Sequence, residues 1–272
     1  MAVSGQIRLG EAPSVSGGTR LLALIGDPVE NSLSPRTHTA FAGALGLPYI
    51  YLAFRITPGR LPAFVGAART LNIAGFNVTM PHKQAIIPLL DRLETDAGAV
   101  NAVVNRGGEL IGHNTDGKGF MLSLARLGVN AAGKRAVILG AGGAAKAVSR
   151  ALRKSGARVA ILCRRPGSAD MSGADILSWE QTAEAAGSAD MLVNATPLGS
   201  TGHAGFDSLG FVDALPAGAL VYDLVSYPAE TALMAAARRR GLTVVGGEAL
   251  LVSQAALSFE LFTGVAPDLG GA

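Results

Sequence analysis

The stretch AVILGAGGAAKAV, residues 136–148, decides the fold of this chain. It places Gly140, Gly142 and Ala145 in a G-x-G-x-x-A pattern between an apolar run and a segment with helical spacing. The first two glycines permit a tight turn and a close approach of the backbone to a pyrophosphate, and the next helix offers free N–H groups at its N-terminus. Because the pattern stands between a strand and a helix, it predicts a dinucleotide-binding loop; the alternative is a ligand-free glycine turn.

The end of the next expected strand indicates which dinucleotide binds. An NAD-preferring site usually carries Asp or Glu there, to hold the ribose 2′-hydroxyl. This chain has Cys163, Arg164 and Arg165 instead. Guanidinium groups bind planar oxyanions through two hydrogen bonds, so the pair favours NADP, with its 2′-phosphate, over NAD. The alternative is that both arginines belong to a solvated loop.

Apolar runs alternate with helical patterns along most of the chain. The runs expected to form strands are 21–26, 49–54, 73–78, 135–140, 157–163, 190–196 and 219–225, and two further short strands meet at Gly107–Gly108. Strands that alternate with helices predict parallel sheets with crossover helices. We therefore expect an α/β protein with an N-terminal α/β substrate domain and a Rossmann-type doubly wound domain, joined near residues 117–134.

Composition excludes several classes of protein. The 272 residues are 49% hydrophobic and 16% charged, which excludes a disordered chain, and the net charge of +3 is too small to predict a nucleic-acid partner. The longest uncharged stretch, 37–54, is broken by glycines and Pro48, so we expect no membrane span.

The single cysteine allows no intrachain disulfide and favours the cytoplasm. We read residues 1–20 as a loose leader, and the four histidines show no metal-ligand spacing.

Three polar clusters, residues 30–38, 77–83 and 113–119, flank the expected strands of the first domain. Each has a structural explanation; Ser34 and Asp116, for example, are both suited to cap a helix. Ligands of open α/β sheets bind beyond the carboxyl ends of the strands, where these clusters should converge. Asn77 and Thr79 are two residues apart, so they leave the strand on the same face. Hydroxyls, amides, a lysine and a carboxylate together suit a small polyhydroxylated acid.

Six ordered motifs carry a resemblance: SLSP (32–35), NVTMPHK (77–83), AVNA (99–102), NTDG (114–117), GAGGAA (140–145) and LLVSQAALSFELFTG (250–264). Over residues 22–264 the sequence resembles the shikimate dehydrogenase family. The resemblance implies reversible reduction of 3-dehydroshikimate to shikimate with NADPH, within aromatic amino acid biosynthesis. It also implies a monomer or homodimer, with a small hydroxy acid as the bound partner.

The resemblance assigns roles position by position. The implied catalytic pair is Lys83 and Asp116, and Ser32 and Ser34 would hold the substrate carboxylate. The remaining residues are those for the ring hydroxyls (Asn77, Thr79, Asn101, Gln254), the phosphate loop (Gly140, Ala141, Gly142, Gly143, Ala144) and the nicotinamide pocket (Leu224, Gly247). The last helix would return to the first domain, which implies a substrate domain of 1–116 with 249–272 and a cofactor domain of 117–248.

The role of Lys83 and the function of the protein each have more than one interpretation. Hydride transfer to a carbonyl requires a proton on its oxygen, which Lys83 would supply as an acid or merely stabilise as a fixed charge, with Asp116 orienting it. Ala102 replaces the threonine of AVNT, CRR replaces NRT, and Ser226 and Ala249 replace a usual tyrosine and glycine. The alternatives are a quinate or quinate/shikimate dehydrogenase using NAD or NADP, and a non-catalytic ligand-sensing or binding relative.

Overall fold

The structure is a computed structural model that describes residues 15–166 and 173–270. These residues form two compact units: unit 1 contains 15–115 and 254–270, and unit 2 contains the described residues of 116–253. The sequence had placed Asp116 and residues 249–253 in the substrate domain, whereas they belong to unit 2. Most of the predicted leader lies outside the described residues, and 15–19 form a turn before the first strand.

Unit 1 is built on a six-stranded sheet in the order β2-β1-β3-β5-β6-β4. Its strands are β1 (Arg20–Gly26), β2 (Tyr49–Arg55), β3 (Gly75–Val78), β4 (Arg92–Leu93), β5 (Ala102–Arg106) and β6 (Glu109–His113). β1 lies between β2 and β3 and pairs with both in parallel, whereas β3–β5 and β5–β6 are antiparallel. The two short strands predicted around Gly107–Gly108 are confirmed, and they make this sheet mixed rather than purely parallel.

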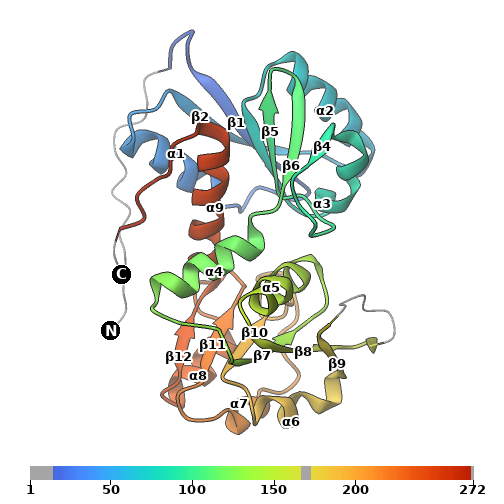
Figure 1. Ribbon diagram of the computed structural model, residues 1–272, viewed down its shortest axis with the longest axis vertical. Helices are drawn as coiled ribbons and strands as arrows, with labels where there is room; N and C mark the ends of the chain where they lie inside the picture. Colours follow the sequence, from blue (N-terminus) through green and yellow to red (C-terminus); the bar gives the residue numbers. More distant parts are fainter. Residues whose placement is uncertain (1–14, 167–172, 271–272) are drawn as a thin grey trace. The chain divides into compact units, whose positions relative to one another are not determined.

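Helices cover both faces of the first sheet (Figure 1). They are α1 (Ser34–Ala44), α2 (Leu61–Thr70), α3 (His82–Ala85) and the second half of α9 (Gly247–Thr263). α2 buries Leu61, Val65 and Ala68 against inward residues of β1 and β3. On the opposite face, Phe41 of α1 meets Phe259 of α9 edge-on, with ring centroids 5.6 Å apart.

Unit 2 has a six-stranded, fully parallel sheet in the order β12-β11-β10-β7-β8-β9. Its strands are β7 (Arg135–Leu139), β8 (Arg158–Cys163), β9 (Asp175–Ser178), β10 (Met191–Asn194), β11 (Leu220–Asp223) and β12 (Thr243–Val245). Counted along the chain this is the strand order 3-2-1-4-5-6 of a Rossmann fold. The predicted doubly wound architecture is confirmed, with β9 and β12 as additional edge strands.

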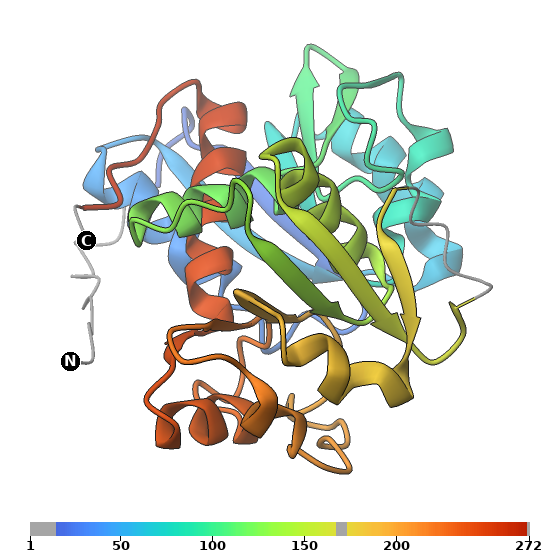
Figure 2. The same cartoon turned by 60° about the horizontal axis from the view of Figure 1, so that its bottom comes forward.

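Side-chain alternation along the strands creates two separate cores. Ala136 and Ile138 of β7 face α4 (Asp116–Arg126) and α5 (Gly143–Lys154), whereas Val137 and Leu139 face the opposite layer. That layer consists of α6 (Thr182–Ala186), α7 (Phe211–Ala214) and α8 (Ala232–Arg239). α5 runs along β7 and β8 (Figure 2). In the described part of the chain, no helix combines the length and apolar character needed to cross a bilayer.

The contact between β3 and α9 gives a stability test. A Cβ on Gly75 would lie 2.3 Å from Cδ1 of Phe262, whose ring is 2% exposed and has little room to move. We expect Gly75→Ala to lower the free energy of unfolding by about 1–3 kcal/mol, because an overpacked core must shift. Calorimetric melting of the purified variant measures the loss.

Gly66, inside α2, is the matched control. A Cβ there would meet no atom within 4 Å. Gly66→Ala should therefore stabilise the chain by about 0.5–1 kcal/mol, because alanine restricts the unfolded state and favours a helix. Equal melting temperatures for both variants would contradict the proposed close contact.

Candidate active site

The predicted phosphate loop lies at the switch point of the second sheet, where β7 and β10 are neighbours. Gly140 follows β7 with φ of +102°, and a Cβ there would be 2.8 Å from Cγ2 of Thr196. Gly142 is the N-cap of α5 and supplies no side-chain cap, and Gly143 and Ala144 begin that helix. Backbone N–H groups of the first helical turn are therefore available to bind phosphate oxygens, and the phosphate loop stays a prediction.

A cavity of about 1040 Å³ opens beside this loop within unit 2. Gly140, Ala141 and Gly142 line it, together with Lys146 of α5. Cys163, Arg164 and Arg165 line it from the end of β8, so the two predicted arginines line the same cavity as the glycine loop. Cys163 is buried, whereas both arginines are exposed.

A buried hydrogen-bond network holds Thr196, which lines the cavity. The Asn194 side chain at the end of β10 donates to Asp223 at 2.9 Å and accepts from the Thr196 N–H at 3.0 Å. Thr231 donates to the other Asp223 oxygen at 2.6 Å. Burial raises the pKa of Asp223, and its three hydrogen bonds oppose that rise. The loop after β10 is thereby fixed to the loop after β11.

Leu224 and Gly247, predicted to line the nicotinamide pocket, lie together beyond that network. Leu224 donates its N–H to the Asn194 carbonyl at 2.9 Å, and Gly247 donates to the Val225 carbonyl at 3.2 Å. Neither residue lines the 1040 Å³ cavity. They occupy a separate place at the carboxyl end of β11 and the start of α9.

Unit 1 brings four of the predicted substrate residues into one buried hydrogen-bond chain. Asn77 donates to the Asn101 carbonyl at 3.0 Å. The Asn101 amide donates to Thr115 at 3.0 Å and to Oε1 of Gln254 at 3.5 Å. Ser34 joins the chain through Tyr51, to which its hydroxyl is hydrogen-bonded. The three amides and the serine thus converge from β3, the residue before β5, α9 and α1.

Tyr51 of β2 connects the serine to the first amide. Its hydroxyl donates to Oδ1 of Asn77 at 2.9 Å. Burial raises the pKa of the Tyr51 phenol, an effect larger than the opposing Ser34 hydrogen bond, so the phenol stays protonated and can donate. The bond fixes the orientation of the Asn77 amide, since Oδ1 must face Tyr51 and Nδ2 must face Asn101.

Ser32 lies in the loop before α1, and Thr79 directly follows β3. Oγ of Ser32 accepts the Ser34 N–H at 3.2 Å. Ser34 begins α1 and makes no side-chain cap bond, so the capping interpretation of this serine is wrong. Thr79 donates its N–H to the Ile25 carbonyl at 2.9 Å, which fixes it at the end of β3.

Lys83 and Asp116 both lie within the first two residues of a helix. Lys83 lies in α3, is half-buried, and accepts the Val100 N–H on its carbonyl at 2.8 Å, one residue before Asn101. Asp116 follows Thr115 directly, is the first residue of α4 and is 8% exposed. Their pairing stays a prediction.

Sequence reasoning missed Tyr51, Thr115 and the aromatic side chains of the cavity. Tyr51 carried a signal, because it occupies a buried position in a strand with alternating burial and has a hydroxyl that needs a partner. Thr115 stood inside NTDG without an assigned role. Trp179 follows a strand that was not predicted, and Phe206 lies in the loop after the predicted strand 190–196, so no pattern placed either ring at the cavity.

Known proteins match this chain over nearly its whole length. A family profile described as the shikimate dehydrogenase substrate binding domain matches residues 24–105. A shikimate dehydrogenase (NADP(+)) of Rubrobacter xylanophilus is 45% identical, over 95% of both chains. Another, of Symbiobacterium thermophilum, is 42% identical over 91% of this chain and 90% of its own.

The chain belongs to the shikimate dehydrogenase family. The solved structure of a shikimate 5-dehydrogenase from Thermus thermophilus in complex with NADP(H) and shikimate superposes with a TM-score of 0.84. It is 35% identical and covers 92% of this chain and 95% of its own. The predicted membership is confirmed.

The departures from the shikimate dehydrogenase family pattern lie at distinct places. Ala102 is fully buried in β5, paired with His113 of β6. Tyr227 is 64% exposed and precedes Pro228 through a cis peptide bond, and Ser226 beside it is half-buried. Ala249 packs against the core of unit 2. None of these replacements removes a member of the hydrogen-bond chain.

His38, behind the network, predicts acid sensitivity. Its ring stacks on Tyr51 at 4.2 Å and is 1% exposed, and neither ring nitrogen has a hydrogen-bond partner. Burial lowers the pKa of His38 from 6.5 to about 3. Because the folded pKa lies below the unfolded one, folding favours the neutral ring, and stability falls as the pH drops from 6.5 toward 3.

We expect this group to contribute a loss of up to about 1.4 kcal/mol for each pH unit below 6.5. His38→Phe keeps a planar ring and removes the titration, so its unfolding free energy should fall less between pH 6.5 and 4.5. Urea unfolding at several pH values measures both curves. Parallel curves for the two proteins would refute the assignment.

Proposed function

We infer that this chain catalyses the NADP-dependent, reversible reduction of 3-dehydroshikimate to shikimate. Its relatives at 45% and 42% identity are shikimate dehydrogenases (NADP(+)), and a structural relative at 35% identity binds NADP(H) and shikimate. The observation that carries the inference is the buried chain of Ser34, Tyr51, Asn77, Asn101 and Gln254. Buried amides and hydroxyls of this kind both donate and accept, which suits a ring bearing several hydroxyl groups.

We propose that Ser32 and Ser34 hold the substrate carboxylate, and that Asn77, Thr79, Asn101 and Gln254 bind the ring hydroxyls. The amides are positioned before substrate arrives, because each is fixed by hydrogen bonds to neighbouring residues. Preorganised donors need no rearrangement during the reaction, and so favour turnover as well as binding.

Lys83, oriented by Asp116, would transfer the proton that the reaction requires. Bound NADPH supplies the hydride that adds to the carbonyl carbon. The Lys83 ammonium donates a proton to the carbonyl oxygen as negative charge develops there, and the Asp116 carboxylate orients that ammonium. In the reverse direction, neutral Lys83 accepts the hydroxyl proton of shikimate.

The second unit supplies the cofactor site. The glycine turn at Gly140 and the uncapped start of α5 fit a pyrophosphate, and Arg164 and Arg165 fit a 2′-phosphate. We also propose a cytoplasmic location and a role in aromatic amino acid biosynthesis, which the buried single thiol and the substrate class support.

Steady-state assays test the reaction and the proton donor together. The protein should reduce NADP with shikimate, and Lys83→Ala should lower kcat by roughly 10²–10⁴-fold. Lys83→Arg keeps the charge but cannot release a proton, so its kcat should stay low as well. Recovery of activity in Lys83→Arg would instead make Lys83 an electrostatic clamp.

The same assay, run with shikimate and with quinate, identifies the preferred substrate. The alternative substrate is quinate, because a related hydroxy acid would satisfy the same amides and hydroxyls. A kcat/KM for quinate above that for shikimate would overturn the inferred substrate. Absence of turnover with either acid would overturn the enzymatic function itself.

Cofactor preference gives a further prediction. Replacing Arg164 and Arg165 by alanine should raise the KM for NADP about tenfold or more while changing the KM for NAD little, because only NADP carries the 2′-phosphate. Arg158→Ala, at the opposite end of β8, is the matched control and should change neither value. An equal loss for both cofactors would refute the role of the arginines.

A further inference from the structure

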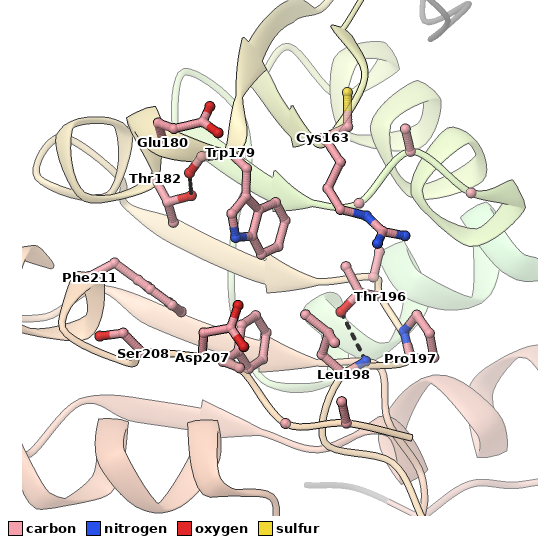
Figure 3. A pocket seen from close by; sticks show the side chains of 18 of the residues that line it. Cys163, Trp179, Glu180, Thr182, Thr196, Pro197, Leu198, Asp207, Ser208 and Phe211 are labelled. Carbon is pink, nitrogen blue, oxygen red and sulfur yellow. Dashed lines mark hydrogen bonds between the residues drawn. The ribbon is translucent and has the colours of Figure 1, made fainter. Parts of the chain in front are cut away.

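One end of the cavity in unit 2 contains none of the predicted cofactor residues. Trp179, Phe206 and Phe211 line this end, which we call the aromatic end, together with Glu180 and Asp207. Trp179 follows β9, whereas Thr196, Leu198 and Asp207 belong to the segment after β10, and all four point into the same space (Figure 3). The aromatic end is therefore part of the same cavity as the glycine loop.

Charge divides this cavity into two regions. The cationic side chains, Lys146, Arg164 and Arg165, line it beside the glycine loop and the end of β8. The carboxylate of Asp207 lies at the aromatic end (Figure 3). Carboxylates repel phosphate, so the aromatic end suits an uncharged planar group whose N–H can donate to a carboxylate oxygen.

Strand register places the aromatic end next to the predicted 2′-phosphate site. β8 and β9 are parallel neighbours, with Cys163 paired to Ser178. The next residues along the two strands are Arg164 and Trp179, which leave adjacent carboxyl ends on the same edge of the sheet. In NADP the adenine and the 2′-phosphate are attached to one ribose, so the base must lie within one sugar of the arginines.

Both aromatic rings are fixed in place. Trp179 begins the short helix η4 (Trp179–Gln181). A capping box at its N-terminus fixes this start, with the Ser178 N–H donating to the Gln181 side chain at 3.0 Å. The Trp179 and Phe206 rings are parallel within 8°, with centroids 6.3 Å apart, and Phe211 supports Phe206 edge-on at 5.6 Å. Both Trp179 and Phe206 are only half-buried, so ring surface remains for a ligand.

We propose that Trp179 and Phe206 bind the adenine ring of NADP by stacking, with Asp207 accepting a hydrogen bond from the adenine amino group. This inference rests on the proposed use of NADP and adds the residues that recognise its base. It makes Trp179 a determinant of cofactor affinity, separate from the arginines that recognise the phosphate.

Intrinsic fluorescence tests the proposal directly, because Trp179 is the only tryptophan of the chain. Titration with adenosine 2′,5′-bisphosphate, which contains the adenine and the 2′-phosphate, should change the emission as much as NADP does. Nicotinamide mononucleotide, which lacks adenine, should leave it unchanged at the same concentrations. The opposite pattern would overturn the proposal.

Variants test the energetic contribution of the ring. Trp179→Ala should raise the Kd for adenosine 2′,5′-bisphosphate, measured by calorimetry, about tenfold, as expected for loss of base stacking. Trp179→Phe keeps an aromatic ring and should remain within about threefold of the parent protein. Melting temperatures of both variants separate loss of binding from loss of folding.

The outcomes also separate this inference from the proposed function. Unchanged affinity in a folded Trp179→Ala, while the parent protein turns over shikimate, would overturn the adenine site alone. Binding of adenosine 2′,5′-bisphosphate with the expected loss in Trp179→Ala, but without turnover of shikimate, would support the adenine site and overturn the reaction.

Discussion

The turn at Gly140 is the constraint on which the cofactor unit depends. At φ of +102°, and with Cγ2 of Thr196 2.8 Å from where a Cβ would lie, this position has no room for a side chain. The chain therefore leaves the centre of the sheet and enters α5 within three residues. That geometry directs the N–H groups of the helix start toward the cavity. The neighbouring strands, β8 and β10, then end where arginine and Thr196 can line the same space.

Buried polar groups impose the matching constraint on the substrate unit. Asn77 and Asn101 are 5% and 3% exposed, so each unsatisfied donor or acceptor would cost about 1–3 kcal/mol. Tyr51, Thr115 and Gln254 satisfy them from three other segments. Because the set is mutually bonded, moving one amide disturbs the others, and the arrangement specifies one geometry for the ligand.

Local pattern was enough to predict the units and much of the site, because each strand carries its own apolar run and each motif ends a strand. The glycine loop, the arginine pair and the two-strand hairpin needed no knowledge of tertiary contacts. Tyr51 could not be assigned, since its role depends on pairing between β1 and β2, which brings it toward Asn77 on β3. Trp179 was missed because β9 is short and only partly buried, so its apolar pattern is weak.

Helix α9 has a consequence for the order in which the molecule can form during synthesis. Unit 1 needs Gln254, Phe259 and Phe262, yet these residues leave the ribosome only after the whole of unit 2. Until then Asn101 lacks one partner and the core around His38 lacks two rings. The substrate unit, although it begins first, must be the second to be completed. A chain that ended at Ser253 would retain the residues of the cofactor unit and leave the other unit unfinished.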